Sequence, residues 1–365
     1  MIFKSKLPDI EIPSIGVYQH VTSNPYNISE DKEIFVDGIT DKKLSFGEFK
    51  RKSKRFAAGL HDKVGFQRGD VLAIISPNQV DYPIVLFGAI AAGDVAEISF
   101  QLSDSGTSVI VTHPFFVSMV AKAAAEAQIP HSKVFLFGNE EVDGFQPCSS
   151  LFVDRDFEPI EYTPEESKNT TVLLCYSSGT TGKSKGVETT HTNMIASVRQ
   201  MVSFETEFGP HNIFMGILPF FHIYGLQVLL HFALILGASV VLLPKFDLRT
   251  FCSVIQSYKV NYAHLVPPIL LLLAKSPIVK EYDLSSLRTI TSSAAPLSTR
   301  LAADIYKIYN IHVKQGYGLT EASPLVSLVD EKNIVQGIMI FDILKSSIGV
   351  IVSNIEAKII SEDGK

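Results

Sequence analysis

The sequence predicts an α/β protein built from two doubly wound, mostly parallel sheets flanked by helices. Short apolar runs rich in β-branched residues lack the alternation of a half-exposed strand, which is typical of parallel strands covered on both faces. Helical stretches separate these runs, and a repeated strand–helix order is typical of doubly wound sheets. The length of 365 residues is enough for two or three packed lobes, and we find no fixed-period repeat.

The individual elements follow from hydrophobic pattern and length. The predicted strands cover residues 71–76, 108–113, 133–138, 171–176, 213–218, 239–243 and 262–266. The predicted helices cover residues 80–92, 115–127, 192–204, 225–236, 248–258 and 298–309. In the last helix, Leu301, Ile305 and Ile308 form one apolar stripe, and Ser298 suits the N-cap position.

Two segments depart from this pattern. After the helix at 80–92, the segment DVAEISFQLSDSG is interpreted as helical from its start, so the strand that a parallel sheet needs there is predicted to be absent. Near the end, Ile355, Ala357 and Ile359 alternate before an Asp-Gly pair, which predicts an antiparallel strand that runs into a hairpin turn. The partner of this strand is expected beyond Lys365.

The composition is that of a core-forming globular protein without a nucleic-acid partner. Hydrophobic residues make up 46% and charged residues 19%, and the net charge is -6 with a pI near 5.9. The basic run at 50–55 lies on a helical pattern, so it predicts a solvated helix face. The apolar side of that helix consists of Phe46, Phe49, Phe56 and Leu60.

Cysteine use and apolar segments indicate a reducing, intracellular compartment and no membrane span. Cys148, Cys175 and Cys252 are far apart and odd in number, so neither a zinc site nor a disulfide framework is predicted. The N-terminus lacks the continuous apolar run of a signal peptide. The longest apolar stretch, residues 228–244, is interrupted by polar residues such as His231 and is interpreted as a buried helix, a turn and a strand.

A loop rich in glycines and hydroxyls, YSSGTTGKSKGV, follows the strand predicted at 171–176. Backbone N–H groups in such a loop bind anions, and glycines let a phosphate approach the main chain. The loop offers hydroxyls at Ser177, Ser178, Thr180 and Thr181, glycines at Gly179 and Gly182, and positive charge at Lys183 and Lys185. A loop of this composition without any ligand is the structural alternative.

A Walker A loop is disfavoured as the explanation of this segment. Gly182, Lys183 and Ser184 fit its end, but Ser177 stands where its first glycine is required. A Walker loop also opens a helix directly after its lysine, and Gly186 is a poor helix start. A kinase or ATPase of the Walker type is therefore not expected.

The whole string instead closely resembles the phosphate loop of the adenylate-forming, acyl-activating enzymes. This superfamily contains the acyl-CoA synthetases, the 4-coumarate–CoA ligases, the insect luciferases and the peptide-synthetase adenylation domains. A second specific string, QGYGLTEASPL at 315–325, supports the resemblance, as do LPFFHIYGL at 218–226 and TSSAAPLS at 291–298. The pattern is most similar to 4-coumarate–CoA ligase-like acyl-CoA synthetases and extends over nearly the whole chain. Ser184 replaces the usual proline.

The resemblance implies roles for individual residues. The catalytic residues would be His222, Lys185, Thr320 and Glu321, and Glu321 would bind Mg²⁺. ATP would contact Ser177, Ser178, Gly179, Thr180, Thr181, Gly182, Lys185, Ala294, Ala295, Pro296, Gln315, Gly316, Tyr317, Gly318 and Thr320. The acyl pocket would be lined by Phe221, Tyr224, Gly225, Ser293, Gly316, Pro324 and Leu325. Considered without the resemblance, His222 is more typical of a packed core histidine, and 291–298 of a tight turn.

The implied reaction uses ATP, Mg²⁺ and CoA. A carboxylic acid is first converted to an acyl-adenylate, and the CoA thiol then displaces AMP. The largely apolar pocket with one phenol suits a hydrophobic or aromatic acid, and both a cinnamate and a medium-chain fatty acid stay open. The alternative is an inactive remnant that binds ATP or an acyl ligand without turnover.

The resemblance also predicts the domain organisation. Residues 1–345 form a large AMP-binding domain of two α/β lobes with an apparent internal deletion near 93–94, and residues 346–365 begin a β-subdomain. The small C-terminal domain of the family is expected beyond Lys365. A cytoplasmic location is expected, with a peroxisomal one as the alternative, because a targeting tripeptide would lie at the far C-terminus.

Overall fold

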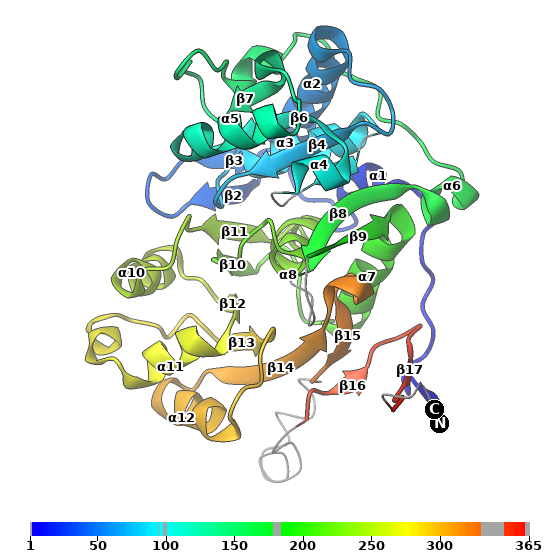
Figure 1. The fold of residues 1–365 in the computed structure, drawn as a ribbon. Coiled ribbons are helices and arrows are strands. Elements are labelled where there is room, and N and C mark those ends of the chain that lie inside the picture. The colour runs from blue at the N-terminus through cyan, green and yellow to red at the C-terminus, as the bar shows by residue number, and fades with distance from the viewer. Residues whose placement is uncertain (1, 94, 98–100, 178–183, 330–346, 362–365) are drawn as a thin grey trace.

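Two mostly parallel sheets, seen one above the other in Figure 1, form the frame of the protein. The computed structural model describes residues 2–93, 95–97, 101–177, 184–329 and 347–361. The arrangement confirms the α/β fold with helix-flanked, mostly parallel sheets that the sequence predicts. The predicted deletion near 93–94 and the boundary at 345 stay predictions.

The upper sheet has six strands among the described residues, and its edge strand β9 is antiparallel to β8. Across the sheet the strands are β7 (Val134–Leu136), β6 (Thr107–Thr112), β4 (Val71–Ile75), β5 (Val95–Glu97), β8 (Thr171–Ser177) and β9 (Lys185–Thr190). The lower sheet has nine strands among those described, and its six inner strands are parallel. Their order is β16 (Val350–Ile351), β15 (Leu325–Leu328), β14 (His312–Gly318), β13 (Thr289–Ser292), β12 (Tyr262–Leu265), β10 (Ile213–Gly216), β11 (Ser239–Leu242), β2 (Glu33–Asp37) and β3 (Lys43–Ser45).

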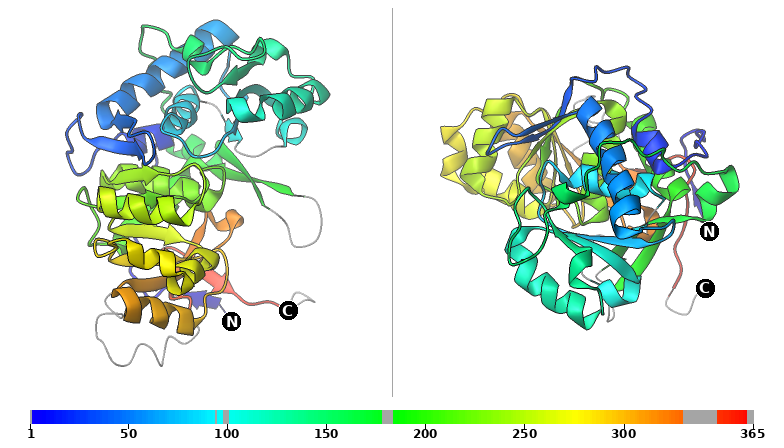
Figure 2. Two further views of the ribbon diagram at one scale, coloured as in Figure 1. Left: turned by 90° about the vertical axis from the view of Figure 1, so that its left-hand side faces the viewer. Right: turned by 90° about the horizontal axis from the view of Figure 1, so that it is seen from above.

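Helices connect the parallel strands and cover the sheets (Figures 1 and 2). The α-helices are α1 (Val17–Val21), α2 (Phe46–Val64), α3 (Tyr82–Ala91), α4 (Leu102–Ser105), α5 (Val117–Glu126), α6 (Pro164–Asn169), α7 (His191–Phe204), α8 (Ile223–Gly225), α9 (Phe232–Leu236), α10 (Leu248–Tyr258), α11 (Pro267–Lys275) and α12 (Thr299–Tyr309). The π-helical segment η4 (Leu226–His231) joins α8 to α9. Single 3₁₀ turns are η1 (Pro114–Phe116), η2 (His131–Lys133), η3 (Cys148–Leu151), η5 (Pro277–Glu281) and η6 (Thr320–Ala322).

Most predicted elements are confirmed to within two residues at each end, but two details differ. The predicted helix at 225–236 consists of π-helical η4 and α9. In α12, Ile305 is fully buried while Ile308 is 47% exposed, so the predicted stripe does not continue to Ile308.

The prediction that no strand follows α3 is wrong. Val95–Glu97 forms β5, which lies between β4 and β8 and is parallel to both. Ala96, the middle residue of β5, is fully buried. Three residues, one of them the polar Glu97, are too short to be recognised as an apolar run, and only pairing with both neighbours defines the strand.

The C-terminal strand also has a partner that was not expected. β17 (Glu356–Lys358) pairs with β1 (Ile2–Lys4) in an antiparallel two-stranded sheet, so one partner comes from the N-terminus. The predicted partner beyond Lys365 stays a prediction. Figure 1 shows the two ends of the chain side by side. β16 extends the lower sheet next to β15. Pairing across nearly the full length of the chain leaves no local signal in the sequence.

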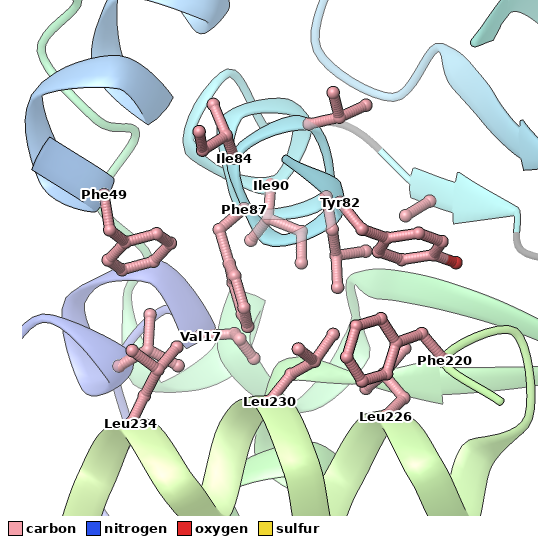
Figure 3. Packing of buried hydrophobic residues seen from close by; sticks show 14 of the residues in the cluster. Val17, Phe49, Tyr82, Ile84, Phe87, Ile90, Phe220, Leu226, Leu230 and Leu234 are labelled. Atoms are coloured by element: carbon pink, nitrogen blue, oxygen red, sulfur yellow. The ribbon is translucent and has the colours of Figure 1, made fainter. Parts of the chain in front are cut away.

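One hydrophobic cluster joins the two sheets. It contains Leu72 from β4 in the upper sheet and Phe214 from β10 in the lower one. Figure 3 shows its centre, where Phe87 and Ile90 of α3 lie toward Leu230 of η4. Each such buried side chain stabilises the fold by about 1.5–3 kcal/mol through removal of apolar area from water. The two sheets therefore form one body, and the elements between them are held from both sides.

The helix α2 carries its basic run on the solvent side, as predicted. Lys50 pairs with Glu30, and Lys52 pairs with Glu48, both at exposed or half-buried positions. The side chains Phe46, Phe49, Phe56 and Leu60 are fully buried. No helix among the described residues is long and apolar enough to cross a membrane.

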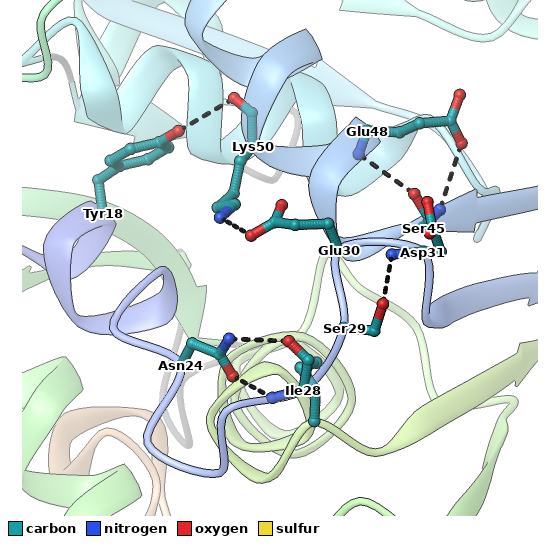
Figure 4. A network of polar contacts seen from close by, with 9 residues as sticks. All are labelled: Tyr18, Asn24, Ile28, Ser29, Glu30, Asp31, Ser45, Glu48 and Lys50. Carbon is teal, nitrogen blue, oxygen red and sulfur yellow. Dashed lines mark hydrogen bonds and ion pairs between the residues drawn. The ribbon is translucent and has the colours of Figure 1, made fainter.

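A reciprocal cap starts α2 (Figure 4). The Ser45 hydroxyl accepts a hydrogen bond from the Glu48 N–H, and the Ser45 N–H donates to the Glu48 carboxylate, each at 3.3 Å. Ser298 holds the equivalent position before α12, as predicted, but its side chain makes no such bond. Both serines thus precede a helix, and of the two only Ser45 makes the cap hydrogen bond.

We expect Ser45→Ala to lower the free energy of unfolding by about 1 kcal/mol, because it removes a capping bond from helix N–H groups that have no intrahelical partner. Ser298→Ala is the matched control and should change it by less than about 0.5 kcal/mol. Urea unfolding followed by circular dichroism measures both. Equal losses in the two variants would contradict the assignment of the cap.

Candidate active site

The β8–β9 hairpin brings the two ends of the glycine-rich segment together. Ser177, the last residue of β8, is the ladder partner of Lys185, the first residue of β9. A strand therefore follows this segment at the place where a Walker A loop has a helix, which agrees with the rejection of that motif. The predicted phosphate contacts Ser178, Gly179, Thr180, Thr181 and Gly182 lie outside the described residues.

A short turn carries two predicted catalytic residues to the same place. Thr320 and Glu321 belong to η6, which lies against β8 and β9. Figure 1 shows this turn, in orange, next to the hairpin. Tyr317, near the end of β14, precedes the turn. It is 47% exposed and therefore is not a core residue. The two specific strings of the sequence thus converge on one side of the molecule.

A pocket of about 180 Å³ opens beside this turn. It is lined by ends of the parallel strands β12 and β13, by the β14–β15 connection and by α7, η4 and α9. Ten of the eighteen predicted site residues that the structure describes lie in its wall. These are His222, Tyr224, Ser293, Ala294, Gly316, Tyr317, Gly318, Thr320, Pro324 and Leu325.

His222 lies at the mouth of the pocket, and one hydrogen bond determines which of its ring nitrogens carries the hydrogen. His222 Nδ1 accepts a hydrogen bond from the Tyr224 N–H at 3.1 Å, so the neutral ring carries its hydrogen on Nε2. Partial burial lowers the pKa of His222, which favours this neutral form. The ring can therefore donate one hydrogen bond to an acceptor at the pocket mouth.

The deep end of the pocket contains a second histidine. The Tyr224 hydroxyl lies 3.0 Å from His264 Nδ1 and 3.4 Å from the Thr291 carbonyl oxygen. Its single hydrogen can be donated to either of these two atoms. His264 Nε2 is buried and has no partner among the described residues. Burial, together with the Lys314 charge, lowers the pKa of His264 to about 3, and burial raises that of Tyr224. Both groups are neutral at physiological pH.

A buried ion pair stands at the same end. The Lys314 ammonium donates to both carboxylate oxygens of Glu205 at 2.7 Å, and Glu205 lines the pocket. Lys314 is fully buried, and its charge also lies 5.3 Å from the Phe208 ring. Removal of one partner from such a pair costs about 3–5 kcal/mol because it leaves a buried charge uncompensated. The pair thus closes the deep end of the pocket with a rigid group of zero net charge.

Several predicted residues lie outside this pocket. Phe221 is 49% exposed and lines a separate cavity of about 380 Å³ between the ends of β4 and β10. Gly225 lies in α8, where a Cβ atom would be 2.2 Å from the Pro219 carbonyl oxygen, so its role there is close packing. The remaining described residues of the prediction do not line the pocket. They are Ser177, Lys185, Ala295, Pro296, Gln315 and Glu321.

The sequence pattern of the family described as AMP-binding enzyme matches residues 27–365. The chain belongs to this family. It is 34% identical to 4-coumarate–CoA ligase 1 of Petroselinum crispum over 382 residues, which cover 100% of the chain and 67% of the relative. It is 33% identical to 4-coumarate–CoA ligase 1 of Narcissus pseudonarcissus over 377 residues, covering 99% of the chain and 67% of that relative.

A solved structure shows the same fold. A long-chain-fatty-acid-CoA ligase from Archaeoglobus fulgidus superimposes with a TM-score of 0.85 at 22% identity, covering 100% of the chain and 74% of that structure. The chain therefore has the fold of the AMP-binding enzymes and belongs to the adenylate-forming acid–thiol ligases, which use ATP.

Part of the pocket of this AMP-binding enzyme was not predicted. His264 and Thr291 stand near the carboxyl ends of parallel strands, where ligands bind in open α/β sheets, so strand position alone was a usable signal. Tyr262 is the first residue of β12, and the other residues lie on helices, on turns or, for Leu328, at the end of β15, where they look like ordinary core residues in the sequence. They are Met201, Glu205, Ile223, Val228, Phe232, Leu319 and Leu328.

The metal prediction depends on Glu321 alone. Among the described residues, no group of three or more histidine, cysteine or acidic side chains could hold a metal ion. Mg²⁺ commonly binds one or two carboxylates and completes its shell with substrate phosphates and water. One exposed carboxylate on a turn that lies against β8 and β9 is compatible with that mode, so Glu321 stays the predicted ligand.

We expect the free energy of unfolding to fall as the pH drops from about 6.5 toward 5. Burial holds the pKa of His20 and His191 near 4, that of His264 near 3 and that of His231 well below its ordinary value. Unfolding restores a pKa of about 6.5, so the unfolded chain binds more protons in this range, and stability is full above it.

Urea unfolding at several pH values measures this slope. Each buried histidine contributes up to about 1.4 kcal/mol per pH unit. The variant His191→Gln should lower the number of protons taken up on unfolding by about one, and the slope of stability against pH accordingly, because its side chain no longer titrates. A stability that is constant between pH 7 and 5, or a slope unchanged in His191→Gln, would contradict the neutral burial of these rings.

Proposed function

We propose that this chain activates a hydrophobic carboxylic acid with ATP, forming an acyl-adenylate and pyrophosphate, and then transfers the acyl group to CoA. The observation that supports this most directly is the common location of three features. The ends of β8 and β9, the turn η6 and the mouth of the apolar pocket lie together. A nucleotide at the turn and an acid in the pocket would have their reacting ends adjacent.

In the first step, a carboxylate oxygen of the acid attacks the α-phosphorus of ATP. The bond between this phosphorus and the β-phosphate oxygen breaks, and pyrophosphate leaves with the electron pair. Both reactants are anionic, and one pair of unit charges about 4 Å apart repels by about 4 kcal/mol at an effective dielectric of 20. The site must therefore neutralise charge and hold the two groups in line.

The residues at the mouth supply these effects. Lys185 contributes positive charge at the start of β9, and the Thr320 hydroxyl donates toward the α-phosphate. The Nε2–H of His222 donates to the carboxylate of the acid and orients its oxygen. The exposed ring of Tyr317 stacks on the adenine, an interaction worth about 1–3 kcal/mol per base. Mg²⁺ held by Glu321 would neutralise phosphate charge when bound.

In the second step, the CoA thiolate attacks the acyl carbon and AMP leaves with the electron pair of the cleaved bond. The acyl pocket itself supports a short, ring-shaped acid. An engineered cavity of about 150 Å³ holds one benzene molecule, and this pocket has about 180 Å³. Val228, Phe232 and Leu325 give it apolar walls, and His264 gives it one unpartnered polar atom. We propose an acid with a single aromatic ring and a hydroxyl group at its far end, which 4-coumarate satisfies.

The test of the proposed function is ATP–pyrophosphate exchange with benzoate, 4-hydroxybenzoate, 4-coumarate and octanoate. We expect acid-dependent exchange that is faster with the ring acids than with octanoate. Glu321→Gln should slow it about 100- to 1,000-fold, because it removes the carboxylate that holds the charge-neutralising ion. Glu281→Gln, the same change at an exposed carboxylate on η5, is the control and should not affect the rate.

Two outcomes would contradict this function. ATP binding without exchange for any acid would instead support a binding protein without turnover. Release of orthophosphate in the absence of acid would support an ATPase.

The predicted hydroxyl contact has its own test. An acid without a hydroxyl leaves His264 Nε2 buried and unpaired, a loss of about 1–3 kcal/mol, so 4-hydroxybenzoate should exceed benzoate by about 5- to 150-fold in kcat/KM. His264→Phe should reduce this ratio to near one, whereas the control His191→Gln should preserve it. An unchanged ratio in His264→Phe would contradict the contact.

A further inference from the structure

A row of hydrogen-bonded, buried polar side chains connects α1 with the turn that contains Thr320 and Glu321. His20 Nδ1 lies 2.8 Å from His231 Nε2, and His231 Nδ1 lies 3.2 Å from Gln227 Oε1. Gln227 Nε2 then donates to the Ser323 carbonyl at 2.9 Å and to the Met194 carbonyl at 3.1 Å. All three side chains are at least 96% buried, since His20 is 4% exposed and Gln227 and His231 are 0% exposed.

The two carbonyls determine which nitrogen carries the hydrogen in each hydrogen bond of this row. Carbonyl oxygens only accept, so the Gln227 atom that faces them is the NH₂ group and its Oε1 faces His231. Oε1 also only accepts, so His231 Nδ1 carries a hydrogen and donates it. The neutral His231 then has a bare Nε2, which accepts from the Nδ1–H of His20. The two carbonyls thus fix which way the Gln227 amide points, and the two histidines hold its oxygen from the other side.

The row of side chains ends at the turn that contains the predicted catalytic residues. Ser323 has a φ of 63° and is buried, two residues after Glu321 and directly before Pro324 of the pocket wall. The other backbone hydrogen bonds within residues 319–324 are local, from the Leu319 N–H to the Pro324 carbonyl, from the Ala322 N–H to the Leu319 carbonyl and from the Ser323 N–H to the Thr320 carbonyl. Gln227 connects the turn to α7 and to η4.

The π-helical form of η4 explains how one segment serves both purposes. Leu226 and Leu230 of this segment lie toward α3 in the core (Figure 3), while Val228 lines the pocket and Gln227 reaches the turn. π-helical turns insert an extra residue into a helix and are frequent at functional sites. The wall of the acyl pocket and the support of the turn are therefore parts of the same rigid segment.

We propose that Gln227 is a positioning residue that holds the Thr320–Glu321 turn at a fixed distance from the acyl pocket, with His231 and His20 holding its amide oxygen from the other side. The proposal rests on the proposed function, since the turn matters for adenylate formation. A displacement of about 1 Å between reacting groups can reduce a rate about 100-fold. Loss of the Gln227 bonds should therefore act on catalysis more than on substrate binding.

The main test compares Gln227→Met with Gln200→Met. Gln200 is also buried and also donates to a backbone carbonyl, that of Ser353 at 2.8 Å, but it lies outside the site. The first readout is amide hydrogen exchange of residues 318–325, which does not depend on activity. We expect at least 10-fold faster exchange there in Gln227→Met and no change in Gln200→Met.

The second readout is ATP–pyrophosphate exchange with 4-hydroxybenzoate. Gln227→Met should lower kcat at least 10-fold and leave KM for ATP within about 3-fold, because the ground-state contacts remain. His231→Gln keeps a donor and an acceptor and should retain activity, whereas His231→Leu should lose part of it. Normalising to the folded fraction by circular dichroism removes simple loss of fold.

Equal effects of the two glutamine variants on exchange and on kcat would overturn the proposal, as would unchanged protection of the turn in Gln227→Met. Failure of every acid to support exchange in the wild-type chain would overturn the proposed function instead, while the hydrogen-exchange comparison would still decide the structural role of Gln227.

Discussion

The tight turn between β14 and β15 is the constraint on which the site depends. The Leu319 N–H donates to the Pro324 carbonyl at 3.0 Å, and a Cβ atom on Gly318 would lie 2.1 Å from that carbonyl oxygen. Only glycine allows this approach, and the approach folds Thr320 and Glu321 back over the ends of β8 and β9. Without the turn, the β8–β9 hairpin and the pocket would have no common edge.

The charges around the pocket give the acid one orientation. The deep end contains the carboxylate of Glu205, the ammonium of Lys314 that neutralises it, and the uncharged rings of His264 and Tyr224. Among the described residues at this end, no free positive charge is available to a second carboxylate, and burial of an unpaired charge is costly. We therefore expect the neutral end of an acid to enter first and its carboxylate to stay at the mouth beside His222. This is the orientation that adenylate formation requires.

The sequence predicted those features that local pattern determines. Continuous apolar runs located the inner strands, and the strings LPFFHIYGL and QGYGLTEASPL located His222, Tyr317 and Thr320, which the structure brings to one pocket. Features without a local pattern were missed. β5 is only three residues long, β17 pairs with the opposite end of the chain, and η4 is π-helical where a regular helix was predicted. His264 was treated as part of a strand, because a single histidine in an apolar run gives no sign of the cavity beside it.

The most direct test of the central claim is a crystal structure of the protein with ATP, Mg²⁺ and 4-hydroxybenzoate. The account predicts one nucleotide whose adenine lies against Tyr317 and whose α-phosphate lies between Lys185 and Thr320, with the ring of the acid next to His264. A nucleotide bound away from η6, or an acid seated in the cavity beside Phe221, would contradict it.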